Sequence, residues 1–226
     1  MRCRCQEEAL KERMLRASRI PERYLHCTIE GFEIWDRDPG GKQTLVKAKR
    51  RTREFVDLYP SVEHGLLFQG PPGTGKTHLA VAALRELILT KGVRGLYANA
   101  IDLVQELQMT FDGGGRSRES ILQPVVDAEL LVLDELGTGK MSPWVQDLLY
   151  YVINSRYMTK RLTLFTTNYA DWAGSEGTSV LRTLETLADR ISPALRSRLY
   201  EMSEQIDIRC KGDYRREAVG SPRPRS

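Results

Sequence analysis

Gly70-Pro71-Pro72-Gly73-Thr74-Gly75-Lys76-Thr77 is the stretch that decides the fold of this chain. It fits the pattern G-x-x-x-x-G-K-[ST] of phosphate-binding loops, in which glycines let backbone N–H groups converge on one point. Lys76 is expected to neutralise the β- and γ-phosphates, and the Thr77 hydroxyl to complete the ligand shell of Mg²⁺. Residues 65–69 before the loop predict an apolar strand, and residues 76–91 after it predict a helix that Gly92 ends. The phosphates would therefore lie at a helix N-terminus, where the helix dipole favours anions.

The composition is typical of a globular chain with its own core. Hydrophobic residues make up 41% of the 226 residues, and no apolar run approaches the roughly 20 residues that a membrane span needs. The charged N-terminus lacks the apolar segment of a secretory signal, and the four cysteines form no regular disulfide framework. We therefore expect a cytoplasmic protein without membrane contact, made of one main domain and a small extension.

Charge is distributed unevenly along the chain. Residues 1–60 carry 14 Lys and Arg against 10 Asp and Glu, and residues 209–226 carry six against two. Basic ends that flank an acidic centre favour contact with nucleic acid or an acidic partner. The alternative is that both ends are merely solvated and partly disordered.

A second motif follows the P-loop, where the apolar run 130–133 ends in Asp134 and Glu135. A continuous apolar run is typical of a central parallel strand that is buried on both faces. Ligands of open parallel sheets bind at the C-terminal ends of the strands, where these two carboxylates are expected. We interpret the pair as a Walker B element, in which Asp134 holds Mg²⁺ largely through water and Glu135 polarises the attacking water.

Residues 162–166 predict another buried strand, which is followed by Asn168. An amide at that end of a strand can contact the γ-phosphate or the attacking water, and its alternative role is that of an ordinary turn residue. We favour the catalytic role. The other predicted elements are a strand at 95–98, helices at 6–19, 42–59, 100–111, 121–126, 142–157 and 180–189, a helix from Ser192, strand character over 200–209, a turn at 38–41 and a loop at 112–119. Asn99 and Ser142 are expected to cap the helices that follow them.

The succession of P-loop, acidic strand end, Thr-Thr-Asn strand end and late arginines resembles a AAA+ ATPase. The closer resemblance is to the DnaC/DnaI family of helicase loaders, with IstB-type transposition ATPases as near relatives. It covers about residues 1–216. Besides the P-loop and the following His78, its most specific pieces are IPERY at 20–24, SRLYEM at 197–202 and DYR at 213–215.

The resemblance implies several site roles. Asn168 takes the sensor 1 position and Arg215 the sensor 2 position, whereas Arg198 is the arginine finger that reaches the ATP of a neighbouring subunit. Arg196 is the alternative finger, and either arginine could instead form a local ion pair on a helix surface. The implied nucleotide-binding residues are the P-loop residues 70–77 together with His78, Asp134 and Arg215.

The N-terminal cysteines suggest a comparison with zinc elements. Cys3, Cys5, His26 and Cys27 could make four ligands, but their spacing matches no standard pattern, so we favour reduced, free thiols and no zinc in this chain. DnaI-type loaders often carry a larger N-terminal domain with a zinc element. By that resemblance Cys3 and Cys5 correspond to its second half, and residues 1–60 are expected to be a remnant of a zinc-binding and helicase-binding element.

The resemblance also implies a site for single-stranded DNA. Phe111, Ser142 and Trp144 match the positions that line the DNA channel. Three cations lie nearby in the sequence, namely Arg116, Arg118 and Lys140. Aromatic rings interleaved with cations suit sequence-tolerant strand binding, because bases stack and phosphates pair. The alternative is that Phe111 and Trp144 are core residues at helical spacing.

We therefore predict an α/β fold, namely a P-loop NTPase of the AAA+ class with a parallel, doubly wound sheet over residues 61–217. Only 58 residues follow Asn168, so the helical lid is expected to be reduced or absent. Residues 1–60 are predicted to be a basic helical extension, and residues 218–226 a disordered basic tail.

The predicted function is ATP-dependent loading of a hexameric replicative helicase onto single-stranded DNA. ATP or ADP with Mg²⁺ is the expected cofactor, and self-association through the ATP interface is expected. Two alternatives stay open: an IstB-type transposition helper that acts on duplex DNA with a transposase, and an ATP-dependent adaptor whose hydrolysis is slow.

Overall fold

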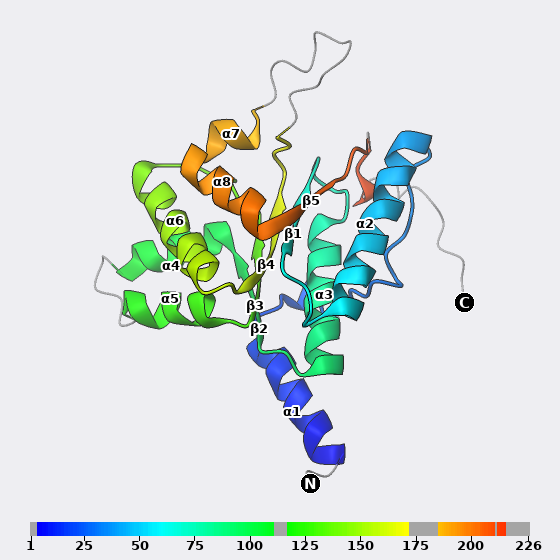
Figure 1. The fold of residues 1–226 in the computed structure, drawn as a ribbon, viewed down its shortest axis with the longest axis horizontal. Coiled ribbons are helices and arrows are strands. Elements are labelled where there is room, and N and C mark those ends of the chain that lie inside the picture. The colour runs from blue at the N-terminus through cyan, green and yellow to red at the C-terminus, as the bar shows by residue number, and fades with distance from the viewer. Residues whose placement is uncertain (1–3, 111–116, 172–184, 211, 216–226) are drawn as a thin grey trace.

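A computed structural model describes residues 4–110, 117–171, 185–210 and 212–215. Within them a five-stranded sheet has the order β2-β3-β4-β1-β5, and every pair of neighbouring strands is parallel. The strands are β1 (Gly65–Gln69), β2 (Gly95–Asn99), β3 (Leu130–Asp134), β4 (Leu162–Thr167) and β5 (Ser203–Asp207). The parallel sheet predicted from the apolar runs is confirmed (Figure 1).

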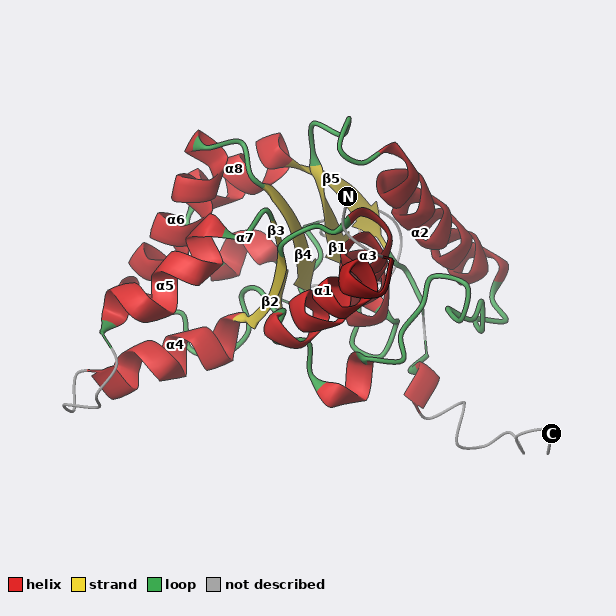
Figure 2. Cartoon of the chain, turned by 90° about the horizontal axis from the view of Figure 1, so that it is seen from below, coloured by secondary structure: helices red, strands yellow, loops and turns green. Residues whose placement is uncertain are grey.

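Helices cover both faces of the sheet, as Figure 2 shows. One face carries α1 (Arg4–Ala17), α2 (Pro39–Leu58) and α3 (Lys76–Lys91). The other carries α4 (Ala100–Met109), α5 (Arg118–Asp127), α6 (Pro143–Met158), α7 (Leu187–Arg190) and α8 (Pro193–Met202). Along β3, Leu130 and Val132 pack into the core of the first face, and Leu131 and Leu133 into the core of the second. This alternation explains why β3 has no polar side before Asp134.

The segment between α1 and β1 belongs to the first core. Ile29 and Phe32, together with Leu45 and Phe55 of α2, are buried among the side chains of α3 and β1. The division of the sequence at residue 60 therefore does not coincide with a break in packing. The helix α1 differs from this segment, because most of its residues are exposed and it extends away from the sheet (Figure 1).

Several helix boundaries confirm the capping residues identified in the sequence. The Asn99 side chain accepts hydrogen bonds from the backbone at the start of α4, and Ser142 caps α6 in the same way. Gly92 ends α3 with a φ of 67°. Among the described helices, none combines the length and apolar character needed to cross a membrane.

Three predicted elements are corrected by the structure. Residues 38–41 form no separate turn, because Asp38 is the N-cap of α2 and Pro39 occupies its first turn, where proline is favoured. The strand predicted from residue 200 begins only at Ser203, since α8 continues through Met202. Of the helix predicted at 180–189, the structure describes α7 at Leu187–Arg190, and residues 180–184 lie outside the described part.

Candidate nucleotide-binding site

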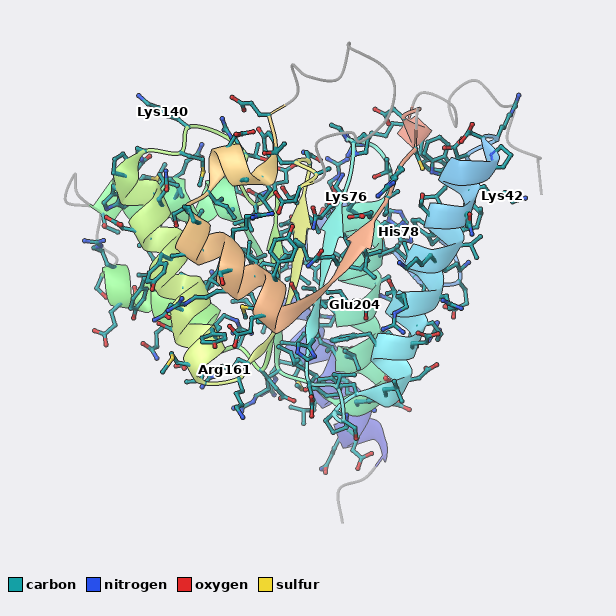
Figure 3. All side chains as sticks on the ribbon, turned by 45° about the horizontal axis from the view of Figure 1, so that its top comes forward. Lys42, Lys76, His78, Lys140, Arg161 and Glu204 are labelled. Atoms are coloured by element: carbon teal, nitrogen blue, oxygen red, sulfur yellow. The ribbon has the colours of Figure 1, made fainter. Side chains whose placement is uncertain are left out.

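A cavity of about 290 Å³ lies between the P-loop and the segment that precedes α2. It is open beside the N-terminal end of α3, where Figure 3 labels Lys76 and His78. The predicted residues that line it are Pro72, Gly73, Gly75, Lys76, Thr77, His78, Glu135, Asn168 and Arg215. The structure therefore brings the P-loop, the Walker B glutamate and both sensor positions to one cavity.

Glycines shape the P-loop in two ways. Gly73 and Gly75 have φ angles of 76° and 90°, in the left-handed region that favours glycine. A Cβ atom on Gly75 would also lie 2.5 Å from the Phe32 ring, and one on Gly73 would lie 1.9 Å from the Asp213 carboxylate. The loop is thus held closely between the segment before α2 and the chain after β5.

Lys76 is nearly inaccessible, with 5% of its surface exposed. Its Nζ donates to the carbonyl oxygens of Gly70 at 2.8 Å and Pro71 at 2.7 Å. Burial lowers the pKa of Lys76 to about 8, against the raising effect of the nearby Asp134 carboxylate. An anion beside the ammonium group would offset this cost of burial, so the residue fits a phosphate ligand.

The Asp134 carboxylate accepts hydrogen bonds from three hydroxyl groups. Its Oδ1 accepts from Thr77 Oγ1 at 2.9 Å and from Thr166 Oγ1, and its Oδ2 accepts from Tyr97 OH at 2.7 Å. A carboxylate beside a threonine hydroxyl at a phosphate-binding loop is the donor set that suits Mg²⁺. Thr77 and Asp134, the two predicted metal ligands, are therefore in contact and fit the ion.

Glu135 stands in a left-handed conformation, with a φ of 59° directly after β3. Its backbone N–H donates to Thr166 Oγ1 at 3.0 Å, and its Oε2 accepts from Asn99 Nδ2 at 3.1 Å. Such strain in a non-glycine residue is typical of functional sites. The contact from Asn99 was not predicted from the sequence, where this residue was identified only as a helix cap. Its position next to Asp134 in the β2–β3 pairing is decided by the register of the sheet.

Part of the cavity lining is aromatic. Tyr24, Phe32, Trp35 and Tyr214 all line the cavity. The Trp35 and Tyr214 ring centroids lie 6.1 Å apart, and Trp35 Nε1 is buried with no hydrogen-bond partner in the part of the chain that the structure describes. A flat, apolar wall with one orphaned donor suits a heterocyclic base. Residues 20–24 carried only a family resemblance in the sequence, and this aromatic lining was not predicted.

His78 contacts this aromatic lining. Its ring meets Phe32 edge-on at a centroid distance of 5.5 Å, and its Nε2 donates to the Thr28 carbonyl oxygen at 2.8 Å. Burial lowers the pKa of His78, so the ring is neutral at physiological pH. The residue that the resemblance placed in the nucleotide site therefore also fastens the N-terminal segment to α3.

The two candidate finger residues make contacts outside the cavity. Arg198 Nε donates to Asn154 Oδ1 at 2.7 Å, and its guanidinium lies 4.9 Å from the centroid of the Tyr150 ring. Arg196 forms an ion pair with Asp171 and lies over Tyr200. Neither arginine lines the cavity of its own chain.

Of the residues matched to a DNA channel, neither Ser142 nor Trp144 lines the cavity. Trp144 is half-buried and packs against the core of the second face, while the Ser142 hydroxyl accepts from the backbone N–H of Val145 at 3.4 Å as the cap of α6. Lys140 is exposed on the loop before α6 (Figure 3). Phe111 lies outside the described residues.

Of the four residues considered for zinc, Cys27 is 2% exposed, and burial raises the pKa of its thiol to about 11. Such a thiol is a poor metal ligand, because metals bind the thiolate. Cys3 and the side chain of Cys5 lie outside what the structure describes.

Residues 5–216 match the family of IstB-like ATP binding proteins. The chain belongs to this family. It is 31% identical to the replicative helicase loader DnaC of Escherichia coli K12 over 157 residues, which make up 70% of this chain and 61% of that protein. It is 27% identical to the phage-like element PBSX protein XkdC of Bacillus subtilis over 219 residues, which cover 93% and 74% of the two chains.

The IstB-like chain also resembles solved structures. A crystal structure of the DnaC helicase loader superposes with a TM-score of 0.68 at 33% identity, covering 83% of this chain and 99% of that one. A DnaI structure superposes with a TM-score of 0.65 at 22% identity, covering 84% and 95%. The P-loop AAA+ fold predicted from the sequence is thereby confirmed. The chain spans less than two thirds of the length of the DnaC protein that it matches in sequence.

Proposed function

We propose that the chain binds ATP with Mg²⁺ in this cavity, hydrolyses it, and uses the cycle to load a replicative helicase onto single-stranded DNA. The observation that carries the proposal is the convergence of a buried Lys76, the strained Glu135 and Thr77 on one cavity, with Asp134 hydrogen-bonded behind Thr77. Membership in a family of ATP binding proteins supports the ligand. The similarity to proteins named replicative helicase loader supports the biological role.

Each residue has a defined part in the proposed hydrolysis. Lys76 binds the β- and γ-phosphates, and Thr77 and Asp134 hold Mg²⁺, whose charge balances that of the phosphates. Glu135, oriented by Asn99, directs the attacking water, and the amide of Asn168 helps to place it. Arg215, which lies after β5 in the chain and lines the cavity, contacts the nucleotide.

In this proposal residues 61–217 are the ATPase domain, and residues 1–60 contribute the contact with the helicase. The exposed α1 provides the free surface for that contact. The DNA strand would follow Phe111, Ser142 and Trp144, with the exposed Lys140 supplying charge.

A loading assay tests the proposal. A hexameric replicative helicase, circular single-stranded DNA and ATP are mixed with the wild-type chain, with Lys76→Ala or with Glu135→Gln. We expect loading with the wild type alone, strongly weakened ATP binding by Lys76→Ala, and ATP binding without hydrolysis by Glu135→Gln. Equal loading in all three mixtures would show that the cavity has no part in loading.

The family itself supports a second candidate, namely a transposition helper that acts on duplex DNA. The form of DNA that stimulates hydrolysis separates the two functions. Stimulation by single-stranded DNA and helicase supports the loader, whereas stimulation by duplex DNA and a transposase supports the helper. The slow-hydrolysing adaptor predicts no stimulation by either.

Self-association is tested through Arg198, which we propose to complete the ATP site of a neighbouring subunit. Arg198→Ala should bind ATP normally but lose stimulation on assembly, because a finger of this kind contributes about 10³–10⁵ in rate. Mixing Arg198→Ala with Glu135→Gln should restore part of the activity, since each chain supplies what the other lacks. If the mixture assembles and stays inactive, Arg196 is the finger to test next.

A further inference from the structure

The Asp134 carboxylate is held by one donor that no nucleotide-binding motif contains. Thr77 belongs to the P-loop and Thr166 to the strand end that carries Asn168. The third donor, Tyr97 of β2, lies 6% exposed and gives its hydroxyl to Asp134 Oδ2 at 2.7 Å. Both threonines bind Oδ1, so Tyr97 is the partner that the structure shows for the other oxygen.

Strand β2 supports both acidic residues of the site. Tyr97 and Asn99 are two positions apart, so their side chains leave the strand on the same face. Tyr97 donates to Asp134, and Asn99 donates to Glu135. The pairing of Asn99 with Asp134 across β2 and β3 sets this arrangement.

Donors on both oxygens determine how the carboxylate is rotated. The terminal torsion of an aspartate is broad and roughly two-fold, so hydrogen bonds to one oxygen leave the plane of the group poorly defined. A phenol on Oδ2 keeps Oδ1 turned toward Thr77. The backbone of Tyr97 is itself restrained, because β2 pairs with β3 and the Tyr97 N–H donates to the Ser18 carbonyl oxygen at 2.7 Å.

We propose that Tyr97 is a positioning residue for Mg²⁺, which it influences through Asp134 without being a ligand. The inference rests on the proposed binding of nucleotide with Mg²⁺. Outer-shell partners of metal-binding carboxylates typically affect metal affinity by about 10- to 100-fold. Loss of this single hydroxyl should therefore weaken the affinity for Mg²⁺ specifically and leave the phosphate contacts of Lys76 in place.

Tyr97→Phe tests the proposal, since it removes the hydroxyl and keeps the buried ring. The matched control is Tyr59→Phe. Tyr59 is also buried and also donates its hydroxyl to a carboxylate, that of Glu129. Neither Tyr59 nor Glu129 lines the cavity. Both variants lose a phenol–carboxylate hydrogen bond, and only one of these bonds contacts Asp134.

The measurement is the fluorescence of a methylanthraniloyl-labelled ATP, first in EDTA and then along a Mg²⁺ titration. We expect Tyr97→Phe to bind the nucleotide in EDTA as the wild type does, and to need about tenfold more Mg²⁺ for half of the metal-dependent change. Tyr59→Phe should follow the wild-type titration. In an Asp134→Ala background, Tyr97→Phe should add no further shift, because the carboxylate through which Tyr97 acts is gone.

Three results would overturn the role of Tyr97: a Mg²⁺ titration of Tyr97→Phe that coincides with the wild type, an equal shift in Tyr59→Phe, or weaker binding of Tyr97→Phe already in EDTA. A wild type that binds no nucleotide, or that does not respond to Mg²⁺, refutes the proposed function itself. Thermal melting of each variant shows whether the fold is retained.

Discussion

The two ends of the cavity are built in different ways. The phosphate end consists of residues 70–77 and the ends of β3 and β4, and its contacts join side-chain hydroxyls, an ammonium group and a carboxylate. The aromatic end consists of the side chains of Tyr24, Phe32, Trp35 and Tyr214. The phosphate end is centred on eight consecutive residues, whereas the aromatic end joins segments almost 180 residues apart.

The two ends suit different parts of a nucleotide, namely its phosphates and its base. A phosphate needs backbone N–H groups and one cation in a fixed geometry, which eight consecutive residues provide. A base needs flat apolar surface, which any nearby aromatic residue offers. Gly75 joins the two ends, because its lack of a side chain lets the Phe32 ring approach the P-loop.

The largest effect should come from the phosphate end. Lys76→Ala removes a charge-assisted contact, so ATP binding should weaken by about 2–3 kcal/mol. Adenosine, which has no phosphate, should bind the variant as it binds the wild type. Calorimetric titration with both ligands checks this. An equal loss of affinity for ATP and adenosine would mean that the phosphate end and the aromatic end do not bind separate parts of the nucleotide.

A smaller effect should appear as the pH rises above 8. The pKa of Lys76 is about 8 because of burial, and bound phosphate should raise it. Below pH 8 the lysine is protonated with or without nucleotide, so ATP affinity stays constant. Above pH 8 the free protein must take up a proton to bind, and affinity should fall by up to about tenfold per pH unit.

Lys76→Arg is the control for this titration, because a guanidinium stays charged throughout the range. ATP affinity of this variant should therefore show no decline between pH 8 and 10. If the wild type also shows none, the ammonium of Lys76 does not contact the phosphates.

The smallest effect should come from the aromatic end. Trp35→Ala removes one ring of the wall, so ATP and adenosine should both lose about 0.5–1.5 kcal/mol of binding. Trp35→Phe keeps a ring but lacks the orphaned Nε1 donor. It should bind both ligands with an affinity between that of Trp35→Ala and that of the wild type. A loss confined to ATP would show that the base lies elsewhere in the cavity.

The arrangement of the core and of the phosphate end was predictable from local patterns. Apolar runs identified β1, β3 and β4, and capping residues such as Asn99 and Ser142 marked where α4 and α6 begin. The boundary at residue 38 was misjudged, because Asp-Pro-Gly suits a turn and a helix start equally well. Local chemistry alone does not separate these two outcomes.

Arg156 shows what local patterns miss. Its place in α6 gives no sign of burial, yet 1% of its surface is exposed, and its guanidinium donates to the carbonyl oxygens of Val125, Val126 and Ala128 at the end of α5. The packing of α5 against α6 decides this contact, and neither helix alone predicts it.

The P-loop, the acidic end of β3, the order of most elements and the family could be predicted from the amino-acid sequence. These features depend on residues close together in the chain, where glycine conformations, caps and apolar periodicity act locally. The contacts of Tyr97 and Asn99 with the two carboxylates, and the aromatic lining with Phe32 and Trp35, emerge only in the folded chain. Strand register and side-chain packing bring these distant residues together, and no local pattern encodes either.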